Sequence, residues 1–160
     1  RFIEKKFVVV KPANQAPKYK SVISKLELDL PENPLSYSAC PNATKEDGIW
    51  ASSAINELNV GMSATETISS NALVLGADPL VEEKSLGEED YVSVIIPYIK
   101  NAREGVIRLG DLVTKHGTYE MNGIGFNDEN ECWWIETIGG HHWIAKRVPV
   151  SLFYLILIFI

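Results

Sequence analysis

Residues 123–148 read "GIGFNDENECWWIETIGGHHWIAKRV". This stretch contains three runs rich in aromatic and β-branched residues, which favour strands. The short "DEN" and "GG" segments between the runs consist of residues that favour turns. The stretch therefore predicts three antiparallel strands in succession, joined by tight turns.

The segment before these strands has helical periodicity. Apolar residues recur at the spacing of one helix face, and Ser85 followed by Glu88 matches the spacing of a capping box. Pro97 is expected to kink or end this helix, because proline lacks a backbone donor and crowds the preceding turn. The residues of the predicted apolar face are Val92, Ile95, Ile96 and Ile99.

A second helix is predicted to begin near Asn101, with Glu104 three residues later, and to end at Lys115, His116 and Gly117. Positive charge suits the last turn of a helix, and glycine readily adopts the left-handed conformation that follows it. The apolar face of this helix is predicted to consist of Val106, Leu109, Leu112 and Val113.

The first part of the chain alternates extended runs with turn residues. Residues 21–30, "SVISKLELDL", show the period-2 pattern of a half-buried strand. Residues 49–67 predict two short strands joined by a turn at Asn56 to Asn59. The order of strands, then helices, then strands indicates an α+β fold with helices packed on sheets in layers. With 160 residues and no internal repeat, we expect residues 1–160 to form a single domain.

Composition narrows the range of partners and compartments. A formal net charge of −6 argues against nucleic acid and anionic membranes, because both require clustered Lys and Arg. Two cysteines, Cys40 and Cys132, without a dense cysteine framework, are compatible with the cytoplasm. The apolar run at residues 150–160 is shorter than a membrane span requires and is predicted to be a buried strand.

The adjacent His141 and His142 are the first candidates for chemistry. If both lie on a strand their side chains point to opposite faces, so the pair is poorly spaced for one metal ion, and no metal site is predicted. One of them is expected to face inward beside Trp143 and Glu136, where an acid/base role or a purely structural hydrogen bond are both open. Neither cysteine has the neighbours that activate a nucleophile.

Five stretches together resemble the PepD-type bacterial dipeptidases, which are cysteine peptidases related to choloylglycine hydrolases and penicillin V acylases. The stretches are "YKSVISK", "GIWASSAINELNVGMSATETI", "SLGEEDYV", "YIKNAREGVIRLGDLVTKHGTYEMNGIGFND" and "WWIETIGGHHWIAKRVP". The resemblance covers Phe7 to Pro149. It implies an incomplete N-terminal-nucleophile (Ntn) hydrolase sandwich, in which antiparallel sheets stack between helices.

In this family a cysteine at the mature N-terminus attacks the dipeptide carbonyl, and its own α-amino group serves as the base. This cysteine and the Arg-x-Glu-Asp-Gly segment after it are absent here and are expected before Arg1, so the chain is predicted to be an inactive internal fragment. Residues 150–160 are atypical of the family. By resemblance, Thr65, Glu66, Glu136 and His142 are substrate-pocket candidates, with His141 as the alternative to His142.

The resemblance implies hydrolysis of a dipeptide or short peptide without a cofactor. Unpaired sheet edges and the apolar tail predict a homo-oligomer. Two alternatives stay open at this point. One is a non-catalytic binding or assembly module with the same fold, and the other is a metal-dependent hydrolase that uses His141, His142 and Glu136.

Overall fold

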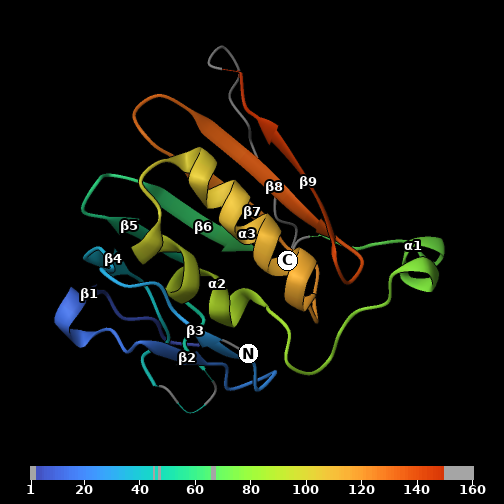
Figure 1. The fold of residues 1–160 in the computed structure, drawn as a ribbon, viewed down its shortest axis with the longest axis horizontal. Coiled ribbons are helices and arrows are strands. Elements are labelled where there is room, and N and C mark those ends of the chain that lie inside the picture. Colours follow the sequence, from blue (N-terminus) through green and yellow to red (C-terminus); the bar gives the residue numbers. More distant parts are fainter. Residues whose placement is uncertain (1–2, 45, 47, 66–67, 150–160) are drawn as a thin grey trace.

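The computed structural model describes residues 3–44, 46, 48–65 and 68–149, and its main element is a seven-stranded antiparallel sheet (Figure 1). The strand order is β1-β4-β5-β6-β7-β8-β9, so each strand from β4 onward lies beside the next one in the sheet. The strands are β1 Val8–Val10, β4 Tyr37–Ala39, β5 Ser53–Asn56, β6 Gly61–Thr65, β7 Gly123–Asn127, β8 Cys132–Ile138 and β9 His142–Arg147.

The three strands predicted from residues 123–148 and the hairpin predicted around Asn56 to Asn59 are confirmed. The backbone N–H of Asn59 donates to the carbonyl of Asn56 and closes the turn. The buried Asn56 side chain also donates to the carbonyls of Ile96 and Ile99, at 3.0 and 2.8 Å. One amide therefore ties the hairpin to the helical layer.

The strand predicted over residues 21–30 is confirmed at Glu27–Asp29 and wrong for residues 21–26. A small separate hairpin, β2 Lys18–Lys20 and β3 Glu27–Asp29, brackets an irregular loop in which Lys25 has a φ of 62°. The buried Glu89 carboxylate accepts hydrogen bonds from the N–H groups of Val22 and Ile23 and from the Ser21 hydroxyl, each at 2.9 Å. A long-range acceptor thus holds the loop in a shape that local alternation does not indicate.

The first predicted helix is present as α2 Glu88–Ile95, followed by the 3-10 turn η2 Ile96–Tyr98. Pro97 lies in that turn, so the predicted end of the α-helix is confirmed. The predicted capping box is wrong, because the cap residue is Gly87, whose N–H donates to Asp90 Oδ2 at 2.9 Å. The Ser85 hydroxyl instead donates to the carbonyl of Val81.

The second predicted helix is confirmed as α3 Ala102–His116. Asn101 caps it by accepting the N–H of Glu104 at 2.8 Å, and Gly117 follows it with a φ of 73°. The helix lies close against the sheet: a Cβ at Gly110 would come within 2.4 Å of the Trp143 ring. Glycine at this position is therefore what lets helix and strand approach.

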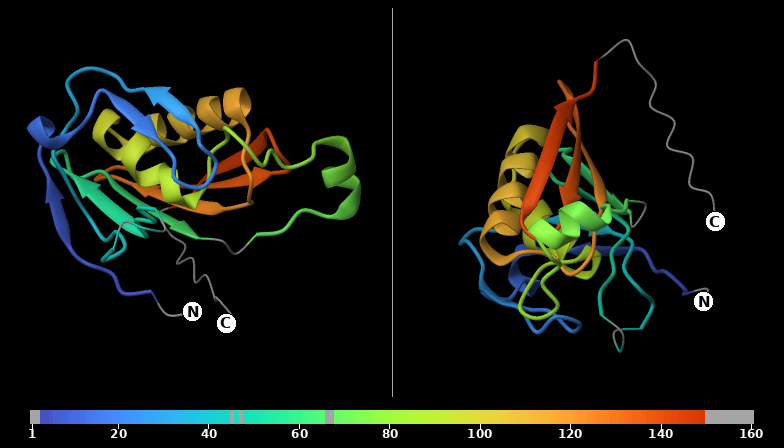
Figure 2. Two further views of the ribbon diagram at one scale, coloured as in Figure 1. Left: turned by 90° about the horizontal axis from the view of Figure 1, so that it is seen from below. Right: turned by 90° about the vertical axis from the view of Figure 1, so that its right-hand side faces the viewer.

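Helices α2 and α3 cover one face of the sheet, as both views in Figure 2 show. The core lies between these two layers, and its members from the sheet alternate along each strand, as period 2 requires. The buried side chains of this layer include Met62, Ile124, Phe126 and Ile135 from the sheet and Ile95 and Leu109 from the helices. The predicted α+β arrangement of helices on a sheet is confirmed.

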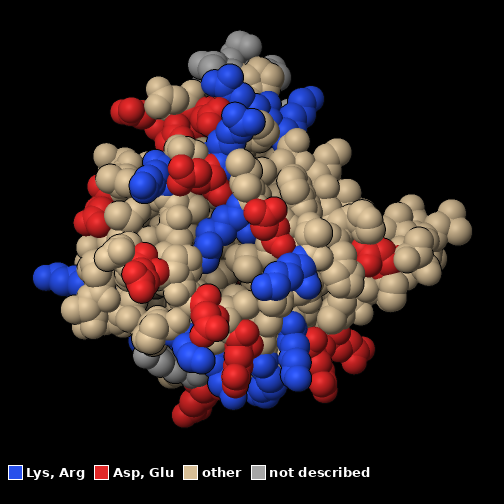
Figure 3. Space-filling model, in the orientation of Figure 1, with Lys and Arg blue, Asp and Glu red and all other residues tan. Residues whose placement is uncertain are grey.

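A short helix, α1 Ala72–Ala77, projects from the body beyond the turn between β8 and β9 (Figures 1 and 2). None of its residues is buried, and Leu73 is 86% exposed. The projection is mostly uncharged, whereas acidic and basic residues are interspersed over the helix-covered face (Figure 3). The apolar tail at 150–160 lies outside the described residues. Among the described residues, no helix has the length and apolarity needed to cross a membrane.

Candidate active site

The face of the sheet opposite the helices carries a cavity of about 1150 Å³. Side chains from neighbouring strands reach this open face because alternate residues of each strand point away from the core. Ser63, Trp134 and Glu136 line the cavity, together with Ile68 from the segment that follows β6. This face therefore combines apolar surface with a few polar groups, as ligand sites do.

Strand pairing brings two of the four pocket candidates into one row across the sheet. Thr65, the last residue of β6, lies opposite Gly123, and Gly123 lies opposite Glu136. Glu66 lies outside the described residues. Because Gly123 has no side chain, the space between the Thr65 and Glu136 positions is left for a side chain from a neighbouring strand.

The indole of Trp134 occupies the space above that glycine. A Cβ at Gly123 would lie 2.3 Å from Trp134 Cζ2, so any other residue would displace the ring. The indole N–H donates to Glu136 Oε1 at 2.8 Å. The half-buried Glu136 carboxylate is thus fixed by its own neighbour on the same face of β8.

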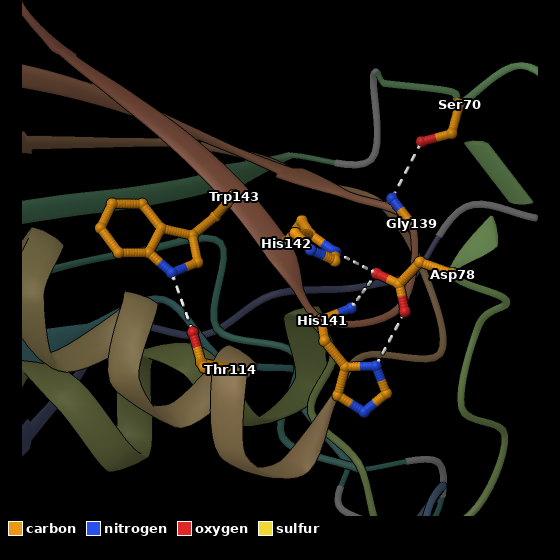
Figure 4. Close-up of polar contacts among 7 residues, drawn as sticks. All are labelled: Ser70, Asp78, Thr114, Gly139, His141, His142 and Trp143. Atoms are coloured by element: carbon orange, nitrogen blue, oxygen red, sulfur yellow. Dashed lines mark hydrogen bonds and ion pairs between the residues drawn. The ribbon is translucent and has the colours of Figure 1, made fainter.

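The two histidines do not diverge as expected for neighbours on a strand. His141 belongs to the turn and only His142 begins β9, so both rings reach the same carboxylate (Figure 4). His141 Nδ1 lies 2.9 Å from Asp78 Oδ1, and His142 Nδ1 lies 2.7 Å from Asp78 Oδ2. The expectation that one histidine faces inward is also wrong for His142, whose side chain is 75% exposed.

Further hydrogen bonds join the hairpin turn to the segment that contains α1. The backbone N–H of His141 donates to Asp78 Oδ2 at 2.7 Å, and that of Gly140 donates to the Asp78 carbonyl at 3.0 Å. Gly139 donates to the Ser70 hydroxyl at 3.1 Å (Figure 4). We call these contacts of Ser70 and Asp78 with residues 139–142 the hairpin clasp.

The charge of Asp78 is favoured by this arrangement. Burial alone raises the pKa of a carboxyl group, but the hydrogen bonds from His141 and His142 outweigh burial and hold the pKa of Asp78 well below its usual range. Asp78 therefore remains an anion, and the histidines serve it as donors.

The metal-dependent alternative required His141, His142 and Glu136 to converge. In the structure the imidazole Nδ1 atoms face Asp78, whereas Glu136 is bonded to Trp134 and paired in register with Ile144. Within the described ranges, no group of three or more His, Cys, Asp or Glu side chains is arranged to hold a metal ion. The geometry gives that alternative no support.

Both cysteines are free, and both line the cavity on the open face. Cys132 is exposed at the start of β8, and Cys40 is half-buried just after β4. Neither thiol forms a hydrogen bond with another described residue. Among the described residues around them, none is placed as the adjacent base that a cysteine nucleophile needs.

Sequence reasoning missed Asp78 and Trp134. Asp78 had no signal, because its partners lie more than sixty residues away in the chain. For Trp134 the sequence contains a weak signal. The alternating glycines of "GIG" leave gaps on one face of β7, and a large residue on the next strand can fill them.

The family model described as Peptidase family C69 matches residues 1–156. The chain is 58% identical over 148 residues to "Probable dipeptidase A" of Streptococcus pyogenes serotype M1, which covers 92% of this chain and 31% of that protein. It is 55% identical over 159 residues to "Dipeptidase" of Bifidobacterium longum (strain NCC 2705), covering 92% and 30%.

Among solved structures, penicillin V acylase from Agrobacterium tumefaciens has the same fold. The TM-score is 0.56 at 10% sequence identity, and the match covers 91% of this chain and 42% of the acylase chain. The expected layered Ntn-hydrolase fold is therefore confirmed. The chain spans about a third of the length of each of these two dipeptidases.

Proposed function

The chain belongs to peptidase family C69, and from that premise we propose that it forms part of a cysteine dipeptidase that hydrolyses dipeptides or short peptides. The observation that carries the proposal is 58% identity to a probable dipeptidase over 92% of the chain. The cavity lined by Ser63 and Glu136 supports it, because the open face offers room for a short peptide.

The chemistry we propose is acyl transfer through a thioester. A cysteine outside this chain, at the mature N-terminus of the enzyme, attacks the peptide carbonyl, and its α-amino group takes the thiol proton and returns it to the leaving amine. Water then hydrolyses the thioester. The described residues supply neither nucleophile nor base, so their proposed part is to form the pocket wall, with Thr65, Glu66 and Glu136 beside the substrate.

His142 has a different proposed part. Its contact with Asp78 holds the hairpin turn, and the segment bound there continues back to Ile68 at the cavity and to Thr65 at the end of β6. We therefore assign His142 to the support of the pocket wall. His141, the alternative candidate, shares this part through the same carboxylate.

The test compares two purified proteins, the full-length product of the gene that encodes this chain and the 160-residue chain alone. We expect the full-length product to hydrolyse L-Ala-L-Ala, to lose activity on thiol alkylation, and to keep it in the presence of a chelator. We expect the 160-residue chain to be inactive. Hydrolysis by the chain alone, or activity lost on chelation, would contradict the proposal.

Three further points belong to this proposal. Residues 1–160 form a single partial domain that the rest of the polypeptide completes. The enzyme is cytoplasmic, which its two free cysteines support and cell fractionation tests. It is also a homo-oligomer, which the exposed apolar surface of α1 supports and sedimentation of the full-length product tests.

A further inference from the structure

We infer that Glu136 and Trp134 form the subsite that binds the free α-ammonium group of the peptide substrate. The inference rests on the proposed function and adds the feature that restricts the enzyme to substrates with an unblocked N-terminus. Three features support it: the position of the Glu136 carboxylate, the position of the Trp134 indole, and the row that Thr65, Gly123 and Glu136 form across the sheet.

The carboxylate of Glu136 has a fixed position and one oxygen that can accept a further hydrogen bond. One oxygen, Oε1, accepts the indole N–H of Trp134 at 2.8 Å, and no described donor is bonded to Oε2. Within the described part of the chain, no Lys, Arg or His side chain forms an ion pair with Glu136. A half-buried carboxylate that lines a cavity without a cation is suited to a cation supplied by a ligand.

The indole of Trp134 adds a second feature that favours a cation. Its ring lies over Gly123 and reaches towards Gly125, where a Cβ would be 3.9 Å from Cε3. One face of the ring therefore packs on the backbone of β7, and the ring also lines the cavity. An indole face attracts ammonium groups through its electron-rich π system.

The subsite also lies in the right place for the proposed reaction. Thr65 and Glu136 flank Gly123 in one row, and the indole of Trp134 covers the glycine, so a ligand held by Glu136 can extend across the indole towards the end of β6. An α-ammonium group has three donors, enough to bond the free oxygen of Glu136 and other acceptors at once. An acylated nitrogen has neither the charge nor those donors, so the subsite discriminates against blocked peptides.

The experiment uses the full-length gene product and three variants: Glu136→Gln, Trp134→Phe, and Glu83→Gln as the matched control. Glu83 is exposed and lies outside the cavity. We expect Glu136→Gln to raise KM for L-Ala-L-Ala by about 10- to 100-fold with a much smaller change in kcat. We expect Trp134→Phe to raise KM by a smaller factor, and Glu83→Gln to leave it unchanged.

The pH dependence of KM separates recognition from a merely structural part. In the wild type KM is expected to rise above about pH 8, where the α-amino group of the substrate loses its proton. In Glu136→Gln this rise is expected to disappear. An unchanged KM, or an unchanged pH dependence of KM, would overturn the inference.

Calorimetric titration with L-alaninamide and N-acetyl-L-alaninamide tests the inference without turnover. We expect the wild type to bind L-alaninamide more tightly, and Glu136→Gln to lose that preference even if no dipeptide is hydrolysed. A wild type that shows no hydrolysis but keeps the preference would contradict only the proposed function. Equal binding of the two amides by the wild type would overturn the inference. The inference would also be overturned if Glu136→Gln lowered the thermal stability and weakened the binding of both amides equally. Glu136 would then pair with a cation of the protein and not with the ligand.

Discussion

At the scale of single residues, Asp90 links the N-terminal hairpin to the helical layer. The carboxylate is fully buried and accepts the Tyr19 hydroxyl at 2.7 Å and the N–H of Gly87 at 2.9 Å. Burial raises the pKa of Asp90 to about 6, because removal from water disfavours the charged form. The hydrogen bonds from Tyr19 and Gly87 act in the opposite direction, and the neighbouring charge of Glu89 adds to the rise.

This raised pKa predicts how stability depends on pH. The folded protein binds the Asp90 proton more tightly than the unfolded chain, whose Asp pKa is near 3.9. The resulting stabilisation is fully present below about pH 4 and is lost as pH rises through about 6, by about 2 to 3 kcal/mol. We expect Asp90→Asn to remove this component, measured as the thermal midpoint of the full-length product from pH 4 to 8. Asp29→Asn, on the exposed side of β3, is the control. Parallel curves for wild type and Asp90→Asn would contradict the prediction.

At the scale of elements, the hairpin clasp joins the β8–β9 turn to the segment that carries α1. Its charged acceptor is Asp78, and its backbone donors are Gly139, Gly140 and His141. Because Asp78 has a lowered pKa, its stabilisation is present above the unfolded pKa near 4 and is lost only as pH falls further. The clasp therefore remains closed at neutral pH.

We expect Asp78→Asn to open the clasp locally without unfolding the sheet. Hydrogen bonds to a charged acceptor contribute about 1.5 to 3 kcal/mol, so exchange of the His141 amide should become about 10-fold faster or more. Hydrogen exchange of the full-length product measures this change. Amides in the middle of β7 serve as internal controls and should be unaffected. Equal acceleration throughout the sheet would show that Asp78 supports global stability instead.

At the scale of the whole molecule, the rest of the enzyme is expected to cover the end of the open sheet face around Cys132, whereas the end around Glu136 stays open to the proposed substrate. Cys132 lies there and is exposed in the described structure, while Cys40 is half-buried. The reactivity of these thiols therefore reports whether the face is covered.

We expect Cys132 to react with a thiol reagent at least about 10-fold more slowly in the full-length product than in the 160-residue chain, because covered backbone and side chains must first open. A Cys132→Ser variant identifies its signal, and Cys40 shows whether the isolated chain is folded, since both thiols react alike when it is not. Equal Cys132 rates in a folded chain and in the full-length product would show that this face stays open.

The elements that could be predicted are those with local causes. The periodicity of α2 and α3, the cap at Asn101 and the turn at Asn56 to Asn59 are each set by residues close in sequence. The loop at residues 21–24 could not be predicted, since its shape depends on Glu89, more than sixty residues away. The cap of α2 was missed for a local reason, because Gly87 and Asp90 have the same three-residue spacing as the predicted pair Ser85 and Glu88.

The features of the candidate site also separate into those with local causes and those set by long-range contacts. The sequence by itself determined the order of strands and helices, the family resemblance, and the placing of Glu136 and Thr65 on strands, because alternation and turn chemistry act over a few residues. Only the tertiary structure decided that these two residues share a row with Gly123, that Trp134 covers that glycine, and that both histidines turn to Asp78. Strand register and contacts across the sheet join residues far apart in the chain, and they are chosen by the packing of the whole layer.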